Sequence, residues 1–211
     1  MDLKEATDSS EIYESKFLDY FEVYRSCFSV YRNNVSHQAW HYLQGLLFSE
    51  KGKGNMERIE EDDPEMSYHQ YQHFLTHSPW SHQSLITQVG QDASRVMAIE
   101  KQKSGLPTGL IIDESSHLKK GDLSVGVSRQ YAGTVGKVDN CQVGVYVSLC
   151  NGNRATLVDE RLFLPKCWIE NESRCKQAGI PKQAMREKTK PVLALEMVDL
   201  RPWKIGICSL S

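Results

Sequence analysis

The feature that most constrains the fold is a group of short apolar segments with strand periodicity in the middle of the chain. Gly109–Asp113 contains three consecutive aliphatic residues, which predicts a strand buried on both faces. Leu123–Val127 and Val143–Leu149 carry an aliphatic residue at every second position, as strands with one buried face do. Asn151-Gly152 is a strong hairpin signal, and Arg154–Leu164 is expected to return as a strand. We therefore predict a small sheet of consecutive strands.

An acidic residue, Asp113, closes the first of these predicted strands. A carboxylate there is costly unless it stays hydrated, pairs with a cation or holds a metal ion. A carboxylate at the mouth of a small sheet suits chemistry on phosphates. Aspartyl-phosphate hydrolases also place an Asp after such a strand, but they carry a second Asp where this chain has Ser115.

The part before the sheet has helical periodicity. Glu11–Tyr31 repeats aromatic residues every three or four positions, which predicts an amphipathic helix with one buried face. Ser36, Asn55 and Ser67 are predicted to cap three further helices. The acidic run Glu60–Asp63 is expected to be a solvated linker.

Three histidines follow one another at intervals of four on the predicted helix after Ser67. His69, His73 and His77 share one helix face, which can in principle bind a metal ion. A zinc site needs a closed ligand set with supporting partners, so we expect an exposed histidine row instead.

Composition narrows the class of protein. The 211 residues suffice for one domain with a helical appendage. No segment has the length of a membrane span and the N-terminus is acidic, which predicts a cytoplasmic protein without a membrane partner. The six cysteines form no Cys-x-x-Cys pair and are expected to be reduced, buried thiols.

Charge is unevenly distributed along the chain. Residues 1–70 hold 14 acidic and 7 basic side chains, and residues 71–211 hold 13 and 18, so the two parts carry −7 and +5. This asymmetry is compatible with a second part that binds a polyanion. Pro165–Glu196 is its most basic segment, and it is expected either to line a phosphate backbone or to be a solvated connection. Pro191 is predicted in the first turn of a short amphipathic helix.

A series of motifs stands in a fixed order along the chain. They are Gln72–Trp80, Ile111–Ser115, Lys119–Gly121, Ser124–Tyr131, Gly136–Val145, Arg161–Pro165 with Trp168, Thr189–Pro191 and Leu193–Met197. Together they resemble insertion-sequence transposases of the DDE, RNase H-like superfamily. The resemblance implies an α+β (or α/β) chain with a helical region at residues 1–105, an incomplete RNase H-like mixed sheet at 106–199, which is the first part of the catalytic domain, and a divergent tail at 200–211.

The resemblance also implies a function and a site. Asp113 corresponds to the first catalytic carboxylate, which binds Mg²⁺ or Mn²⁺ for DNA cleavage and strand transfer. Of the residues that usually follow it, Glu114 and Ser115 fit the family pattern, whereas Ser116 replaces a glycine. The expected partners are transposon-end DNA and a full-length transposase or a second copy of the chain. The residues expected to face phosphates are Lys119, Lys120, Arg129 and Lys137.

The similarity ends after Asp199, before the second Asp and the Glu of the family's triad. We therefore expect a truncated transposase that is inactive alone, unless another polypeptide supplies the missing carboxylates. A non-catalytic regulator that binds DNA or a full-length transposase is the first alternative. A degenerate fragment with an unpaired sheet edge is the second.

Overall fold

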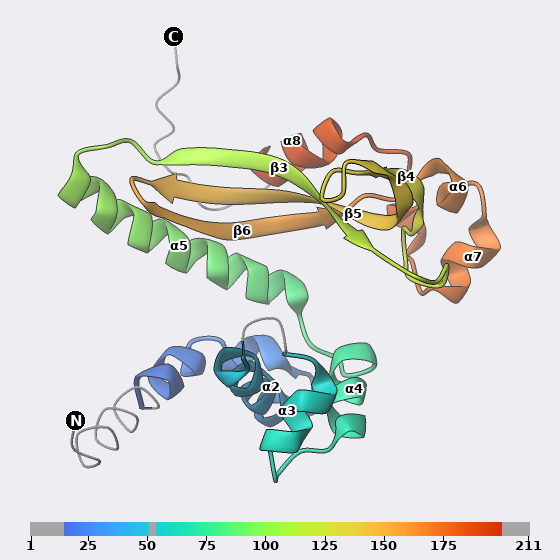
Figure 1. The fold of residues 1–211 in the computed structure, drawn as a ribbon. Coiled ribbons are helices and arrows are strands. Elements are labelled where there is room, and N and C mark those ends of the chain that lie inside the picture. Colours follow the sequence, from blue (N-terminus) through green and yellow to red (C-terminus); the bar gives the residue numbers. More distant parts are fainter. Residues whose placement is uncertain (1–14, 51–53, 200–211) are drawn as a thin grey trace. The chain divides into compact units, whose positions relative to one another are not determined.

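The structure is a computed structural model that describes residues 15–50 and 54–199 (Figure 1). The chain divides into two compact units, Met1–Leu85 and Ile86–Ser211. Within the described residues, the last helix before the four-stranded sheet ends at Ser104, and the sheet begins at Gly109. The boundaries expected after residues 105 and 199 remain a prediction, and the expected divergent tail lies outside the described residues.

The first unit is built from short helices. Residues 15–22 are helical, and the elements that follow are η1 (Arg25–Phe28), β1 (Ser29–Val30), β2 (Asn33–Asn34), α2 (Ser36–Phe48), α3 (Met56–Asp62) and α4 (Tyr68–Thr76). The single helix predicted over Glu11–Tyr31 is therefore wrong at its C-terminal end, and residues 11–14 lie outside the described part. After this helix the chain turns back, so that the Phe21 and Phe28 rings stack with centroids 5.9 Å apart, and Tyr31 has a left-handed conformation at φ 55°.

Side-chain caps explain where these helices begin. Asn55 accepts a hydrogen bond from the backbone N–H of Arg58 at 3.0 Å, and Ser67 forms a reciprocal capping box with Gln70, as predicted. Ser36 does not cap α2, because it is already its first helical residue.

The second unit contains a sheet of four strands (Figure 1). Its elements are α5 (His82–Ser104, which begins in the first unit), β3 (Gly109–Leu118), β4 (Ser128–Ala132), β5 (Lys137–Asn151), β6 (Arg154–Leu162), α6 (Lys166–Ile169), α7 (Glu172–Gln177), η2 (Lys182–Ala184) and α8 (Lys190–Asp199). The long strand β5 is central, with β3 along one side and β4 and β6 following each other along the other side. The α+β class is confirmed. Every strand pairing within residues 54–199 is antiparallel, so the parallel pairing of a mixed sheet is not found there.

Periodicity predicted β5 and its hairpin correctly. Val143, Val145, Val147 and Leu149 are all buried on one face, and the Asn151-Gly152 turn joins β5 to β6 with Gly152 at φ 57°. Gly152 thus occupies a left-handed conformation in which a side chain would be strained.

The strand predicted at Leu123–Val127 is wrong. This segment is a loop, and the next strand begins only at Ser128. Side chains bind the loop's backbone: the Gln142 amide of β5 donates to the Val125 carbonyl at 2.6 Å, and the Trp168 indole N–H donates to the Val127 carbonyl at 2.8 Å. Because these carbonyls are satisfied by side chains, the alternating residues need no partner strand.

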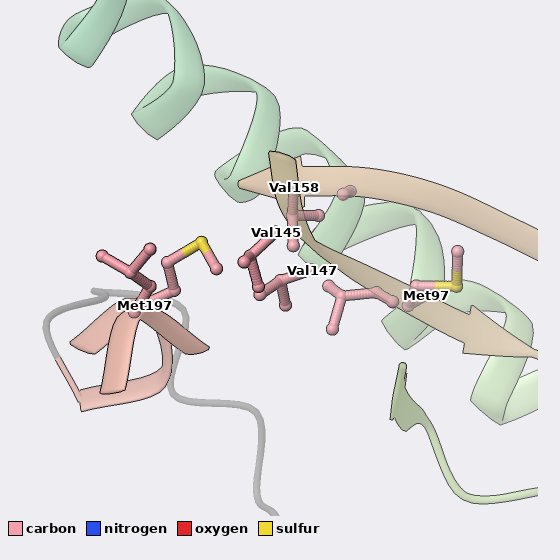
Figure 2. Packing of buried hydrophobic residues seen from close by; sticks show 8 residues of the cluster. Met97, Val145, Val147, Val158 and Met197 are labelled. Carbon is pink, nitrogen blue, oxygen red and sulfur yellow. The ribbon is translucent and has the colours of Figure 1, made fainter. Parts of the chain in front are cut away.

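The core of the second unit lies on one face of the sheet. Figure 2 shows Val145 and Val147 of β5 between Met97 of α5 and Met197 of α8, with Val158 of β6 beside them. All five are buried. The short helix predicted from Pro191 is confirmed as α8, and it covers this face.

The expectation that the first strand is buried on both faces is wrong. Ile111 and Ile112 of β3 are 48% and 42% exposed. The reason is topological: β3 is an edge strand that pairs only with β5 within residues 54–199. The apolar residues of this strand therefore do not indicate that it is buried on both faces.

Two global expectations can be compared with the described residues. The five cysteines among them are free thiols, but Cys167 is exposed, so the expectation of burial is wrong there. No helix in the described part of the chain combines the length and the apolar character required to span a bilayer.

Candidate active site

Asp113 lies in the middle of β3 and its side chain is exposed. The prediction that it closes its strand is therefore wrong, because pairing with β5 continues as far as Leu118 opposite Cys141. One carboxylate oxygen accepts a hydrogen bond from the backbone N–H of Glu114 at 2.8 Å. The structure thus presents this carboxylate from a rigid strand rather than from a loop.

The strand register places Asp113 in a polar row on the open face of the sheet. Asp113 stands opposite Tyr146 of β5, and Tyr146 stands opposite Glu160 of β6. Side chains alternate between the faces of a strand, so these three residues lie on the face opposite to the valine core. The row brings two carboxylates and a phenol onto one surface, with the phenol between them.

Tyr146 leans along the sheet and away from Asp113. Its hydroxyl makes a 2.8 Å hydrogen bond with Nε2 of His117, a residue further along β3. The ring passes over Gly144, where an added Cβ would stand 2.6 Å from the Tyr146 hydroxyl oxygen. Glycine at position 144 therefore permits this conformation.

The environment of Tyr146 favours the neutral phenol. Burial of the ring raises the pKa of Tyr146 above its usual value, and the negative charge of Glu160 raises it further. The Tyr146 hydroxyl can therefore donate or accept a hydrogen bond on this face without carrying charge at neutral pH.

Glu114 points to the other face and has a different role from Asp113. Its carboxylate forms a 2.7 Å ion pair with Nζ of Lys190, the first residue of α8. The same ammonium lies 5.5 Å from the centroid of the Phe163 ring. Glu114 thus helps to attach α8 to the sheet, which leaves Asp113 as the acidic residue of this pair that faces the open side.

The four predicted phosphate-facing residues lie at the other end of the sheet. Lys119 follows β3 and donates its backbone N–H to the Asn140 carbonyl at 2.9 Å, and Arg129 of β4 stands opposite Asn140. Asn140 is six positions along β5 from Tyr146, the residue opposite Asp113, which corresponds to roughly 20 Å. The structure therefore brings Lys119 and Arg129 together but separates them from Asp113.

The remaining two predicted cations differ in their surroundings. Lys120 is exposed in the loop after β3. Lys137 opens β5 and forms a 3.0 Å ion pair with Asp139, which lowers the pKa of that carboxyl group. Lys137 is thus less available to a phosphate than Lys120.

The basic segment Pro165–Glu196 takes part in forming a surface pocket. This pocket of about 310 Å³ is lined in part by Arg161, Arg186 and Lys188. Two of these cations already have acidic partners: Arg161 pairs with Asp159 at 2.9 Å and Lys188 with Glu196 at 2.7 Å. Charge pairing therefore reduces the capacity of this pocket for a phosphate backbone.

The donor set around Asp113 can be compared with the requirements of a metal site. Divalent ions such as Mg²⁺ prefer oxygen ligands, and Asp113 offers such a ligand in an exposed position. Within residues 15–50 and 54–199, however, Asp113 belongs to no group of three histidine, cysteine or acidic side chains close enough to share an ion. The described residues thus supply one ligand of such a site and do not complete a two-metal centre.

Sequence reasoning did not identify Tyr146, His117 and Glu160 as neighbours of Asp113. The alternation along β5 does place Tyr146 on the face opposite to the valines. Its juxtaposition with Asp113 depends on the register between β3 and β5, which no local signal specifies. The bulge between Val147 and Ser148 further shifts the pairing with β6.

Comparison with known proteins identifies similar sequences. A family model described as DDE superfamily endonuclease matches residues 23–207. A curated protein of Microchaete diplosiphon, described as a probable transposase for insertion sequence element IS701, is 36% identical over 136 residues. The alignment covers 63% of this chain and 33% of that relative, so the chain spans about a third of the relative's length. No solved structure matches.

Proposed function

The chain belongs to the DDE superfamily of endonucleases, as the resemblance predicted, and from this premise we propose that it acts as part of an insertion-sequence DNA transposase. In this proposal Asp113 is the first catalytic carboxylate. The supporting observation is its position: an exposed acid on the first long strand of the sheet, inside the matched region, facing the open side.

The chemistry of the family depends on divalent metal ions. Such ions, when bound, activate the attacking oxygen and stabilise the leaving oxygen of the phosphodiester. We propose Mg²⁺ or Mn²⁺ as the ion and Asp113 as one of its ligands. In this proposal another polypeptide supplies the other carboxylates, and the chain alone does not cleave DNA.

The role proposed for Asp113 agrees with its local contacts. Glu114 is held by Lys190 on the covered face, and Tyr146 is drawn away by His117. Asp113 therefore remains accessible to a ligand while its neighbours along and across the strand are held in place. A rigid strand also limits the movement of a carboxylate that has to meet a metal ion in one geometry.

The family acts on DNA, and we propose that the cationic end of the sheet binds its backbone. Lys119, Lys120 and Arg129 are exposed there, and each can contact a phosphate. Lys137 contributes less because Asp139 neutralises it. The DNA ligand in this proposal is the transposon end, and a full-length transposase or a second copy of the chain is the protein partner.

A specific observation favours one alternative, a regulator that binds DNA without cutting it. Among the described residues, Asp113 belongs to no group of three histidine, cysteine or acidic side chains close enough to share an ion. A chain of this kind can occupy DNA or join a transposase complex without catalysis.

Cleavage is tested with supercoiled plasmid and with candidate transposon ends, in the presence of Mg²⁺ or Mn²⁺. The proposal predicts no nicking by the chain alone, and nicking that depends on Asp113 when the rest of an IS701-like transposase is supplied. Asp113→Ala should abolish the complemented activity, whereas the matched control Asp122→Ala, in an exposed loop, should retain it. Complemented activity that survives Asp113→Ala would refute the assignment.

DNA binding is tested separately by mobility shift at several salt concentrations. Replacing Lys119, Lys120 and Arg129 by Gln should weaken binding on all sequences and reduce the slope of log affinity against log salt by about 1 per contact. Lys101→Gln on α5 is the matched control and should leave the slope unchanged. Salt-sensitive binding without complemented cleavage would favour the regulator. Neither activity, together with aggregation, would favour a degenerate fragment.

A further inference from the structure

A second group of ligand-type side chains lies in the helical unit, outside the unit that carries Asp113. His37 and His41 occupy successive turns of α2, and Glu65 lies in the loop between α3 and α4. We propose that these three residues bind a divalent transition metal ion, with Zn²⁺ as the principal candidate. The ion would fix α2 to the loop that precedes α4.

The three potential ligand atoms converge on one point. Nε2 of His37 and Nε2 of His41 each lie 3.7 Å from the same carboxylate oxygen of Glu65. All three ligand atoms lie within 4.8 Å of one another. These separations are too long for hydrogen bonds. They are close to the distance of about 3.4 Å between ligands of a tetrahedral zinc ion with bonds of about 2.1 Å.

A buried carboxylate determines which nitrogen of His41 faces this point. Asp63 lies 2.9 Å from Nδ1 of His41, and both side chains are only 13% exposed. A carboxylate accepts hydrogen bonds, so Nδ1 carries the proton and donates it. Nε2, the atom directed at Glu65, then presents a lone pair. A histidine that donates its other ring N–H to a carboxylate is the usual arrangement beside a protein-bound metal ion.

Asp63 is itself held in place by other groups. It accepts a hydrogen bond from the hydroxyl of buried Tyr71, and another from the backbone N–H of Glu65 at 2.9 Å. The second bond closes a turn that brings the Glu65 carboxylate to the two histidines. The predicted solvated linker is therefore wrong in two respects: Glu60–Asp62 form the last turn of α3, and Asp63 is largely buried and hydrogen-bonded.

The exposure of the ligand side chains indicates how an ion would reach the site, and their positions in the fold indicate its role. His37 and Glu65 are 61% and 67% exposed, so the site opens to solvent and leaves room for a water ligand. The two histidines stand on one helix face at i and i+4, while Glu65 comes from a separate element. A bound ion would thus cross-link two elements of one unit, which favours a stabilising role.

The other histidine group in the chain provides a matched control. His73 and His77 also stand at i and i+4 and their rings stack, with centroids 5.5 Å apart. Their Nδ1 atoms contact the hydroxyls of Ser78 and Thr76 rather than carboxylates, and no acid joins them in a ligand group within the described residues. The two histidine pairs therefore have the same i, i+4 spacing. They differ in their partners, because His37 and His41 lie beside carboxylates whereas His73 and His77 lie beside hydroxyls.

The experiment uses the full chain, stripped with EDTA and titrated with ZnCl₂ by calorimetry. We expect one saturable site per chain, lost in His37→Gln and in Glu65→Gln and retained in a His73→Gln/His77→Gln variant. CoCl₂ should give the visible absorption of a four-coordinate site in the same variants that bind zinc. Asp63→Asn should weaken binding by about 10–100-fold without removing it.

Far-UV circular dichroism distinguishes loss of the zinc site from loss of the fold. His37→Gln is the decisive variant, because His37 is exposed and its replacement leaves the core intact. The proposal is overturned if the native chain shows no saturable zinc binding. It is overturned equally if folded His37→Gln and Glu65→Gln bind as the native chain does, or if the His73/His77 variant loses the site. The outcome does not depend on DNA cleavage.

Discussion

The side chain of Asn151 is predicted to contribute measurably to the stability of the second unit. It is only 3% exposed, at the hairpin between β5 and β6. Its amide N–H donates to the Leu106 carbonyl at 2.8 Å, and its carbonyl accepts from the Ser104 hydroxyl at 2.8 Å. These two bonds hold the end of α5, and the turn after it, against the hairpin.

The expected magnitude follows from the two hydrogen bonds. Each neutral bond contributes about 1 kcal/mol net, so Asn151→Ala should lower the free energy of unfolding by about 2 kcal/mol. A larger penalty is not expected, because Leu106 is 51% exposed and its freed carbonyl can reach water. Asn153→Ala, in the same turn but exposed, is the matched control and should change stability by less than about 0.5 kcal/mol.

Asn151→Asp tests the donor specifically. An aspartate there has the same shape and can still accept from Ser104, but it opposes the Leu106 carbonyl with an oxygen. Burial raises the pKa of such a carboxyl group, so the folded state binds more protons than the unfolded state above pH 4 or so. Stability of this variant should therefore fall as pH rises and recover on acidification, relative to the native chain.

The assay is guanidinium unfolding followed by far-UV circular dichroism, at several pH values for the aspartate variant. A changed midpoint with an unchanged slope would report lost stability rather than altered compactness. The reasoning is refuted if Asn151→Ala is as stable as the native chain, or if Asn151→Asp shows no pH dependence beyond that of the native chain.

Two further predictions concern the sheet and its loops. Gly126→Ala should destabilise by about 2–4 kcal/mol, because Gly126 has φ 76° and an added Cβ would meet a backbone carbonyl oxygen at 2.9 Å. Gly121→Ala, which meets nothing within 4 Å, should be nearly neutral in the same thermal melts. Glu160→Gln should lower the pKa of Tyr146 while leaving it above the usual value, because burial is the larger cause. A raised phenol pKa makes stability fall as pH rises above about 10, so the substitution should reduce that loss. NMR titration of labelled tyrosine measures the shift, and an unchanged pKa would contradict the assigned contribution of Glu160.

Local chemistry made several elements predictable. Asn55 and Ser67 cap their helices as expected, because a cap depends on residues within one turn. The turn at Asn151-Gly152 and the alternation of β5 are also local signals, and both are found in the structure. Motif order along the chain was sufficient to indicate the family.

Signals that depend on distant partners were misleading. The apolar run of β3 predicted burial on both faces, yet the strand lies at an edge because only β5 pairs with it in the described part of the chain. The alternating residues of Leu123–Val127 predicted a strand, yet side chains of Gln142 and Trp168 satisfy carbonyls of that segment instead. In both cases the deciding atoms are separated in sequence from the segment itself.

The sequence by itself determined the residue types, two of the three predicted helix caps, the principal hairpin and the family, and it singled out Asp113 as the candidate for the first catalytic carboxylate. Tertiary structure alone decided which residues surround that carboxylate, because strand register sets Tyr146 opposite Asp113 and Glu160 opposite Tyr146. It also joined His37 and His41 to Glu65, which follows them by more than twenty positions. Side chains so far apart in sequence meet only when helices and strands pack, and packing is governed by the whole core rather than by any local pattern.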